Sequence, residues 1–200
     1  EATHEPDKYP MAGMTSHKVT VGIYDLKTHK TVYLQAGDPK DRYFTNIAWS
    51  PDSKNIYLFE LNRGQNDCRL VSYDAVTGEK QAELYRETSD KYVEPQHPIL
   101  FLPWDETKFI MQSQKDGYNH LYIYNVLGEC VKQLTSGPWV VMKVLGFNNK
   151  QKSIIFEANK EHPLHHRLYS VSMTGKIQQL ETTDGVHNGI LSPSGNYLID

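Results

Sequence analysis

Cysteine is scarce in this chain of 200 residues, and long apolar runs are missing. The two cysteines, Cys68 and Cys130, lie far apart in the sequence and match no metal-binding spacing. We therefore expect two unpaired thiols, with a mutual disulfide as the alternative. The longest apolar stretch, from Val140 to Leu145, is interrupted by Lys143. Because this stretch is far too short to cross a bilayer, no membrane-spanning segment is expected.

Concentrated positive charge is also missing. The chain has 21 lysines and arginines against 24 aspartates and glutamates, which gives a formal net charge of −3. Without a basic patch or a run of Lys and Arg, we expect no nucleic-acid partner. No signal peptide is recognisable, and the sequence begins Glu1-Ala-Thr-His4 without a methionine, which is typical of a trimmed chain. Location therefore cannot be read from a targeting segment.

Catalytic motifs are absent as well. An α/β-hydrolase carries its nucleophile in a Gly-x-Ser-x-Gly turn between a strand and a helix, and this sequence has no such turn. No stretch shows the periodicity of an amphipathic helix. His162, His165 and His166 fall in one segment, but without Cys, Asp or Glu at a ligand spacing they indicate a solvated loop. We expect no catalytic residue, no metal site and no cofactor in this chain.

The chain does contain one short sequence pattern, called here the repeated phrase, that occurs four times. Each copy begins with tyrosine and a polar residue, passes through a short turn and ends in leucine. The copies run from Tyr24 to Leu34, Tyr73 to Leu84, Tyr124 to Leu134 and Tyr169 to Leu180. Their tyrosines are 49, 51 and 45 residues apart (73 − 24, 124 − 73 and 169 − 124). A period of about 40–50 residues built from short strands is typical of propeller blades.

The segments between the copies supply the remaining strands. Residues 1–18 are polar and contain prolines, so we expect an irregular arm, followed by a partial β-propeller domain over residues 19–200. Three blades of four antiparallel strands are expected at about 43–87, 98–136 and 141–182. In each blade an apolar residue ends the first strand and a turn follows. These turns begin after Trp49, Leu102, Phe147 and, in a further partial repeat, Leu191.

The fold prediction is therefore all-β, with three full blades flanked by two half-blades. The sequence opens with a single hairpin at 19–35 and closes with two strands at 186–191 and 197–199. An exposed blade edge is an aggregation liability, so each half-blade needs a partner. Three arrangements would provide one: strands outside this sequence, closure of a four-blade ring by the two halves, or assembly of two chains into an eight-blade ring.

The amino-acid sequences of the repeats and of the segments between them resemble the dipeptidyl peptidase IV family of serine peptidases, in its bacterial form. Six segments match the family in the expected order, from about Tyr9 to Asp200, and their ordered combination is more specific than any one of them. They are Tyr9-Pro-Met-Ala-Gly13 (Tyr-Pro-Lys-Ala-Gly in the family), Ala48-Trp-Ser-Pro-Asp52, Asp116-Gly-Tyr-Asn-His-Leu-Tyr122, Leu134-Thr-Ser-Gly-Pro-Trp139, the run from His162 to Val171, and Leu191-Ser-Pro-Ser-Gly-Asn-Tyr197.

This resemblance implies an N-terminal eight-bladed propeller, of which this chain is a part, and a C-terminal α/β-hydrolase domain absent from the chain. The hydrolase domain supplies Ser, Asp and His and releases N-terminal dipeptides, with Pro or Ala preferred at the second position. The propeller limits access, and its acidic residues hold the peptide's amino terminus. The family's paired glutamates precede the Tyr-Pro-Lys-Ala-Gly element; Glu1 and Glu5 do not match them and are given no such role.

The resemblance carries two further expectations. Family members work outside the cytoplasm, which implies a periplasmic or surface-attached protein. In the family, an arm near the Tyr-Pro-Lys-Ala-Gly element contacts a second subunit, so Tyr9 to Gly13 could lie at the base of such an arm and a homodimer is possible. The alternative for this segment is a frayed chain end.

One segment suggests a direct contact with substrate. Glu94, Gln96 and His97 lie just before the second full blade, in the loop that enters its first strand. The first strand of a propeller blade lines the central channel, so this loop faces one mouth of it. Glu94 could hold a substrate ammonium there, with Gln96 and His97 as hydrogen-bonding neighbours. The alternative is an ordinary inter-blade loop in which Glu94 is solvated.

The function that we expect is therefore a non-catalytic, substrate-gating propeller domain of a dipeptidyl peptidase IV-like serine exopeptidase, with peptide as the partner. The alternative is a TolB-like or WD40-like propeller that serves as a protein-binding scaffold, because propellers host both kinds of function. A propeller enzyme with its site in the channel has no acid–base or metal constellation in the sequence to support it.

Overall fold

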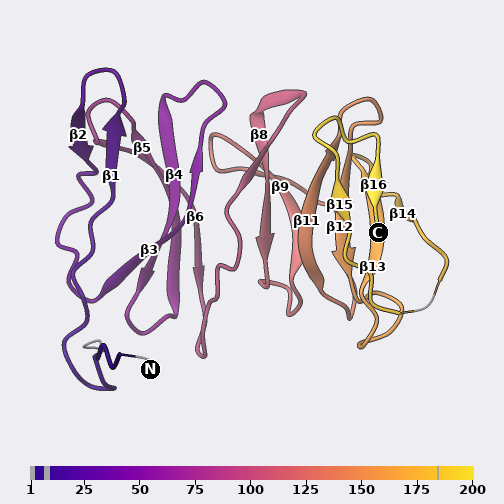
Figure 1. Cartoon of the computed structure of the whole chain (residues 1–200), viewed down its shortest axis with the longest axis horizontal. Helices are drawn as coiled ribbons and strands as arrows, with labels where there is room; N and C mark the ends of the chain where they lie inside the picture. Colours follow the sequence, from indigo (N-terminus) through magenta and orange to yellow (C-terminus); the bar gives the residue numbers. More distant parts are fainter. Residues whose placement is uncertain (1–2, 7–9, 184) are drawn as a thin grey trace.

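The computed structural model describes residues 3–6, 10–183 and 185–200. All regular secondary structure in this part of the chain is β-strand. The strands form three four-stranded and two two-stranded antiparallel sheets. Figure 1 shows the first two-stranded sheet and the three four-stranded sheets standing side by side in the order of the sequence, and the last two-stranded sheet overlaps the third four-stranded one in this view. No helix of the described residues has the length and apolarity needed to span a bilayer. The all-β class and the four-stranded antiparallel blades predicted from the repeats are confirmed.

Each full blade is a meander in which every strand pairs with the next one in the sequence. The leading half-blade consists of β1 (Gly22–Asp25) and β2 (Lys30–Tyr33). The first blade consists of β3 (Arg42–Trp49), β4 (Asn55–Asn62), β5 (Asp67–Asp74) and β6 (Lys80–Thr88). The second blade consists of β7 (Leu100–Leu102), β8 (Asp105–Ser113), β9 (His120–Asn125) and β10 (Cys130–Gln133). The third blade consists of β11 (Val141–Asn148), β12 (Ser153–Ala158), β13 (Arg167–Ser172) and β14 (Ile177–Gln179). The trailing half-blade consists of β15 (Ile190–Leu191) and β16 (Leu198–Ile199).

The N-terminal segment forms no strand in its described residues, 3–6 and 10–18. A turn closes where the Met14 N–H donates to the Met11 carbonyl at 3.0 Å. The Arg63 guanidinium also donates to the Met14 carbonyl, which ties this segment to the first blade. Glu1 and Tyr9, which belong to the predicted arm and to the family-like element, lie outside the described residues.

The polar residue of the repeated phrase stabilises its turn. Asp74 Oδ1 accepts the backbone N–H groups of Val76 and Thr77 at 2.8 and 2.7 Å. Asn125 Oδ1 likewise accepts the N–H of Leu127 at 3.0 Å and that of Glu129 at 2.9 Å. An Asx side chain that satisfies the backbone in this way is a standard means of reversing the chain. The third-to-fourth-strand hairpins are therefore specified locally.

In the third blade the phrase is displaced by two residues. Tyr73 pairs with Ile56 and Tyr124 with Phe109, each directly before the turn. The residue at that place in the third blade is Val171, which pairs with Ile154, while Tyr169 lies two residues earlier in β13. The turn residue there is Ser172, whose Oγ accepts the N–H of Lys176 at 3.1 Å. The true spacing from the second blade is thus 47 residues (171 − 124), closer to the other two.

The hairpin glycines lie against the preceding blade. Gly78 has a φ of 74°, and a Cβ on it would lie 2.3 Å from the carbonyl oxygen of Tyr33 in the leading half-blade. Gly128 has a φ of 87°, and a Cβ on it would lie 2.5 Å from the carbonyl oxygen of Leu84 in the first blade. Only glycine combines this backbone conformation with so close an approach. The repeated glycines are therefore needed both for the turn and for contact between blades.

The hydrophobic core lies between blades rather than within one. Three clusters fill three successive gaps, each built from facing sides of adjacent sheets. Between the leading half-blade and the first blade lie Leu34, Ile56, Leu58, Val71 and Tyr73. Between the first and second blades lie, among others, Phe59, Leu70, Leu84, Phe109 and Tyr122. Between the second and third blades lie, among others, Ile110, Leu134, Trp139, Phe156 and Tyr169.

Candidate functional site

The links between blades and the second-to-third-strand hairpins share one end of the sheets, called here the link face. This follows from the meander topology, because alternate connections of antiparallel strands emerge at opposite ends. In Figure 1 the link after β6 and the hairpin after β8 both leave from the lower end. The predicted substrate-contacting residues belong to the link between β6 and β7 and therefore lie on this face.

The structure brings Glu94 and Gln96 together and directs His97 elsewhere. Both Glu94 and Gln96 are exposed, and Gln96 Nε2 donates to Glu94 Oε2 at 3.4 Å. His97 is partly buried, and its Nε2 lies 3.1 Å from the carbonyl oxygen of Met142 in the third blade. Glu94 therefore presents a carboxylate to solvent with one amide neighbour, while the His97 ring spans the gap to the next blade.

The His97 contact belongs to a series of ties between neighbouring blades. Asn46 Nδ2 in β3 donates to the Pro95 carbonyl in the link to the second blade. Lys143 Nζ in β11 donates to Asn188 Oδ1, at 2.9 Å, in the segment before β15. The contacts of Asn46 and Lys143 hold the first strand of a blade against the entry segment of the next one, and His97 joins such an entry segment to the first strand of the following blade. They fix the backbone of the segment that carries Glu94 on both sides.

A cavity of about 400 Å³ opens between the first and second blades on the link face. Its lining comes from β4, β5 and β6, from the link that carries Glu94, and from the end of β8 with its hairpin. Phe59, Cys68 and Val93 are buried residues of this lining, whereas Tyr92 is exposed. A cavity of this size falls within the range of small-ligand and side-chain sites.

One wall of the cavity is a compact polar cluster. Tyr85 Oη donates to Glu87 Oε2 at 2.6 Å, and Ser113 Oγ donates to the same oxygen at 2.9 Å. Burial raises the pKa of Tyr85, and the neighbouring Glu87 carboxylate raises it further. The phenol therefore stays a hydrogen-bond donor at neutral pH. These bonds join β6 of the first blade to β8 of the second across the gap.

Beside this cluster, Lys115 lies among tyrosine rings. Its Nζ is 4.1 Å from the ring centroid of Tyr122, 5.2 Å from that of Tyr124 and 5.8 Å from that of Tyr85. It also donates to Tyr124 Oη at 2.8 Å. An ammonium over aromatic faces is attracted by their negative quadrupoles. Lys115 is thus held in place by neighbours of its own chain.

Cys68 lines the cavity but does not offer an activated nucleophile. Both thiols are free; Cys68 is buried and Cys130 is exposed, so the expected unpaired state is the one observed. Burial, with the nearby Glu87 and Asp67 carboxylates, raises the pKa of Cys68 to about 12. A thiol with such a pKa stays protonated at neutral pH and is a poor nucleophile. Cys68 is therefore an apolar part of the cavity lining.

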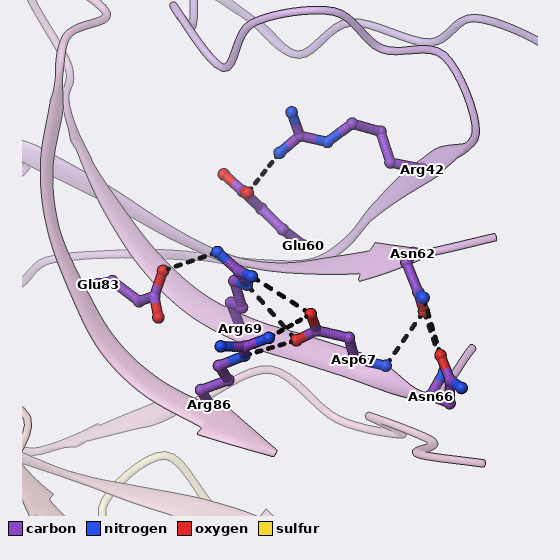
Figure 2. A network of polar contacts seen from close by, with 8 residues as sticks. All are labelled: Arg42, Glu60, Asn62, Asn66, Asp67, Arg69, Glu83 and Arg86. Atoms are coloured by element: carbon purple, nitrogen blue, oxygen red, sulfur yellow. Dashed lines mark hydrogen bonds and ion pairs between the residues drawn. The ribbon is translucent and has the colours of Figure 1, made fainter. Parts of the chain in front are cut away.

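A second polar network crosses the first blade (Figure 2). Asp67 accepts from Arg86 at 2.9 and 2.8 Å and from Arg69 at 3.4 and 3.2 Å. Arg69 also reaches Glu83 at 3.3 Å. The two guanidiniums, Arg86 foremost, hold the pKa of Asp67 at about 2. These charges satisfy one another, which indicates a structural role.

The same view contains a buried carboxylate, Glu60, which accepts from both Arg42 and Tyr73. Burial raises the pKa of Tyr73, and the hydrogen bond to Glu60 adds to the effect. A buried carboxylate is tolerated only when it is paired and hydrogen-bonded, as it is here. The open space of about 310 Å³ beside Arg42 and Glu60 is thus lined by groups engaged with one another.

The clustered histidines do not converge on one point. The rings of His162 and His165 lie 4.6 Å apart, whereas His166 Nδ1 lies 3.1 Å from Glu157 Oε1. Among residues 3–6, 10–183 and 185–200, no three His, Cys, Asp or Glu side chains gather closely enough to hold a metal ion. What the link face offers is an exposed carboxylate beside a cavity.

The sequence patterns placed Glu94 in the link between two blades but gave no sign of the cavity beside it. Tyr85, Glu87 and Ser113 come from two blades and carry no motif, so only their strand positions hint at a meeting. Tyr85 and Ser113 each lie in a predicted strand. Side chains along a strand point alternately to the two faces of the sheet, so each of these side chains is assigned to one face. That the two faces oppose each other across a gap follows from the blade order alone.

Comparison with known proteins gives this arrangement its context. The family model described as the Dipeptidyl peptidase IV (DPP IV) N-terminal region matches residues 1–200. This chain belongs to that family. The dipeptidyl peptidase IV N-terminal region predicted from the six ordered segments is therefore confirmed, and the repeat units are blades of its propeller.

Relatives of this N-terminal region include curated proteins and solved structures. The protein named Probable dipeptidyl peptidase 4 from Aspergillus fumigatus is 26% identical over 96% of the chain, and Inactive dipeptidyl peptidase 10 from Mus musculus is 27% identical over 86%. A protein from Bacteroides ovatus assigned as a dipeptidyl aminopeptidase IV has 51% identity over 96% of the chain and a TM-score of 0.87. Porphyromonas gingivalis dipeptidyl peptidase 4, at 24% identity, shares the fold with a TM-score of 0.85 over 96% of the chain.

The dipeptidyl peptidase IV N-terminal region spans only part of each relative. The chain covers 26% of the Aspergillus protein, 23% of the mouse protein and 30% of the Bacteroides chain, and 27% of the Porphyromonas chain. The activities carried in the names of these relatives belong to proteins three to four times as long.

Proposed function

We propose that this chain is part of the eight-bladed, non-catalytic propeller domain of a dipeptidyl peptidase IV-like serine exopeptidase that releases N-terminal dipeptides. Its role is to gate access and to position peptide for a C-terminal α/β-hydrolase domain. The observation that carries this proposal is the family match over residues 1–200. It is supported by the 51% identity to the Bacteroides ovatus protein assigned as a dipeptidyl aminopeptidase IV.

Within this function, Glu94 holds the amino terminus of a peptide near the mouth of the channel. Its carboxylate is exposed on the link face, and Gln96 is the side chain that orients it. An ammonium at about 4 Å from a carboxylate gains about 1 kcal/mol in water and about 4 kcal/mol at the effective dielectric constant of a protein surface. Replacing the charge should therefore weaken peptide binding about fivefold or more.

Steady-state hydrolysis of a longer peptide that begins Ala-Pro, by the full-length protein, tests this role. We expect Glu94→Gln to raise KM about fivefold and to leave kcat unchanged, because the carboxylate binds peptide and takes no part in bond cleavage. Glu106→Gln is the matched control, since Glu106 is an exposed residue at the start of β8, at the other end of the blade. An unchanged KM in the Glu94 variant would disprove the role assigned to Glu94.

A second function is a protein-binding scaffold of the TolB-like or WD40-like kind. The specific observation in its favour is that a relative with 27% identity is named Inactive dipeptidyl peptidase 10. The coding sequence that follows this chain separates the two. A Gly-x-Ser-x-Gly turn followed by Asp and His supports the peptidase, whereas a hydrolase domain without that serine, or a stop after one or two more blades, supports the scaffold.

Location and assembly are further parts of the proposal. A peptidase of this family would act on peptides outside the cytoplasm, at a periplasmic or surface-attached site of a bacterium, and could work as a homodimer. Cell fractionation followed by immunodetection tests the location, and recovery with the cytoplasmic fraction would contradict it. Light scattering on the purified full-length protein gives the assembly, and a monomer mass at micromolar concentration would rule out a stable dimer.

A further inference from the structure

The gap between the second and third blades is closed by one indole. Trp139 is only 6% exposed and lies stacked on Phe156, with 6.4 Å between ring centroids. The ring of His120 meets it edge-on at 4.7 Å. Trp139 stands two residues before Val141, whose N–H donates to the Asn119 carbonyl of the preceding hairpin at 2.9 Å. A link residue therefore supplies the group that fills this space.

The gap between the first and second blades has the same backbone tie and a different side chain. The N–H of Val93 donates to the Gln65 carbonyl of the preceding hairpin at 2.7 Å, a bond of the same kind as the one that Val141 makes. The residue two positions earlier is Lys91, which is exposed. No indole enters from this position, and the cavity of about 400 Å³ lies at this end of the gap. The neighbouring gap thus shows which kind of group such a space accepts.

The lining of the cavity suits a neutral aromatic group. Its buried part includes Phe59 and the protonated thiol of Cys68, and the ring of Tyr85 forms part of the wall. Aromatic rings pack on such surfaces in edge-to-face or offset arrangements.

The charges around the opening are balanced. Glu87 and Glu94 contribute two carboxylates, and Lys91 and Lys115 contribute two ammonium groups. Glu87 Oε2 already accepts from Tyr85 and Ser113. The remaining carboxylate oxygens, like the exposed one on Glu94, can accept N–H groups from a peptide backbone or an indole. A polar rim around an apolar floor is the usual form of a side-chain subsite.

We propose that this cavity is a subsite for an aromatic side chain of a bound peptide, and that it gives the protein a preference for peptides that carry tryptophan. This rests on the proposed function, since peptide is taken as the ligand, and it adds a specificity to that function. The side chain would occupy the space that Trp139 occupies one gap further along, with its ring against Phe59 and Tyr85.

The test compares two peptides that begin Ala-Pro and differ only in having Trp or Ala at one later position, with the position varied in turn. Binding is measured by calorimetry on the full-length protein after a serine-directed covalent inhibitor has blocked cleavage. At the best position we expect the Trp peptide to bind at least tenfold more tightly, which corresponds to about 1.4 kcal/mol. Binding within twofold at every position would overturn the proposal.

Two variants place the preference in the cavity. Lys91→Trp copies the arrangement of the neighbouring gap and should fill the space, so the tenfold preference should fall to less than twofold. Lys150→Trp adds the same side chain at an exposed position in the hairpin between β11 and β12, and should keep the preference. A preference that survives Lys91→Trp would contradict the assignment of the cavity.

The outcome also separates this proposal from the proposed function. If the uninhibited protein releases no dipeptide, the peptidase function fails, yet the difference in binding between the two peptides still decides the cavity. If dipeptide is released but the two peptides bind alike, the function stands and the aromatic subsite is wrong. Thermal melting of each variant confirms that it is folded before binding is compared.

Discussion

At the scale of single residues, charged side chains of the first blade are paired with one another. Asp67 lies between Arg69 and Arg86, and Glu60 lies between Arg42 and Tyr73. Paired charges of this kind add little at an exposed position and matter more when partly buried, because losing one partner leaves the other without compensation. The network therefore gives information about the pH dependence of folding stability and little about ligand binding.

Asp67 predicts how stability responds to acid. Its pKa is lowered from the usual 3.8 to about 2 by Arg86 and Arg69. A depressed pKa stabilises the folded state above the unfolded pKa, and this contribution disappears as pH falls through the folded value. We expect the urea midpoint to drop between pH 4 and pH 2, and to drop less in Asp67→Asn. Equal slopes for the two proteins over this window would contradict the prediction.

Residue positions and side-chain contacts were predictable to different degrees. The sequence placed Glu94, Gln96 and His97 in one link, because turn and strand patterns locate a link without any knowledge of its surroundings. It could not show that His97 reaches Met142, since that contact depends on the neighbouring blade. Nor could it show that Lys91 and Trp139 each lie two residues before a residue bonded to the preceding hairpin, because the two links differ in length.

At the scale of elements, the hairpins carry more structural information than the tyrosines that mark them. In the third blade the tyrosine lies two residues earlier in its strand, because Val171 takes the position of Tyr73 and Tyr124. The turn residue, Asp, Asn or Ser, and the glycine three or four residues later hold their place in every blade. They do so because they satisfy backbone groups and adopt a left-handed conformation, which few residues can replace.

Substitution of Gly128 measures how much this hairpin glycine contributes to stability. A Cβ there would meet the Leu84 carbonyl at 2.5 Å in addition to the positive φ, whereas Gly117 has a φ of 102° and no atom within 4 Å of the added Cβ. We expect Gly117→Ala to cost about 1 kcal/mol from backbone strain alone. Gly128→Ala should cost about 2–4 kcal/mol, because overpacking adds to that strain. Urea unfolding measures both, and equal losses would show that the inter-blade approach is unimportant.

At the scale of the whole molecule, stability depends on what fills the gaps between sheets. The three clusters of apolar side chains each join adjacent blades. The period of the repeat and the alternation of its strands were sufficient to predict this architecture. The cavity was not predictable, since its lining comes from two blades and the link between them.

Replacing Trp139 and replacing Tyr92 by alanine should therefore change the stability of the fold by different amounts. Trp139 is 6% exposed within its gap and Tyr92 is 59% exposed beside the cavity. Removing a buried indole loses its transfer energy and leaves a void, so Trp139→Ala should cost about 3–5 kcal/mol. Tyr92→Ala should change the free energy of unfolding by less than about 0.5 kcal/mol. A small loss for Trp139→Ala would mean that the blades are held together by other contacts.

The contact between each hairpin glycine and the blade before it gives the chain a direction of assembly. Gly78 lies against Tyr33 and Gly128 lies against Leu84, in both cases a residue made earlier by the ribosome. A chain that emerges N-terminus first therefore always presents the surface that the next hairpin needs before that hairpin exists. We expect such a protein to grow blade upon blade during translation, and a chain stopped early to keep its finished blades in register.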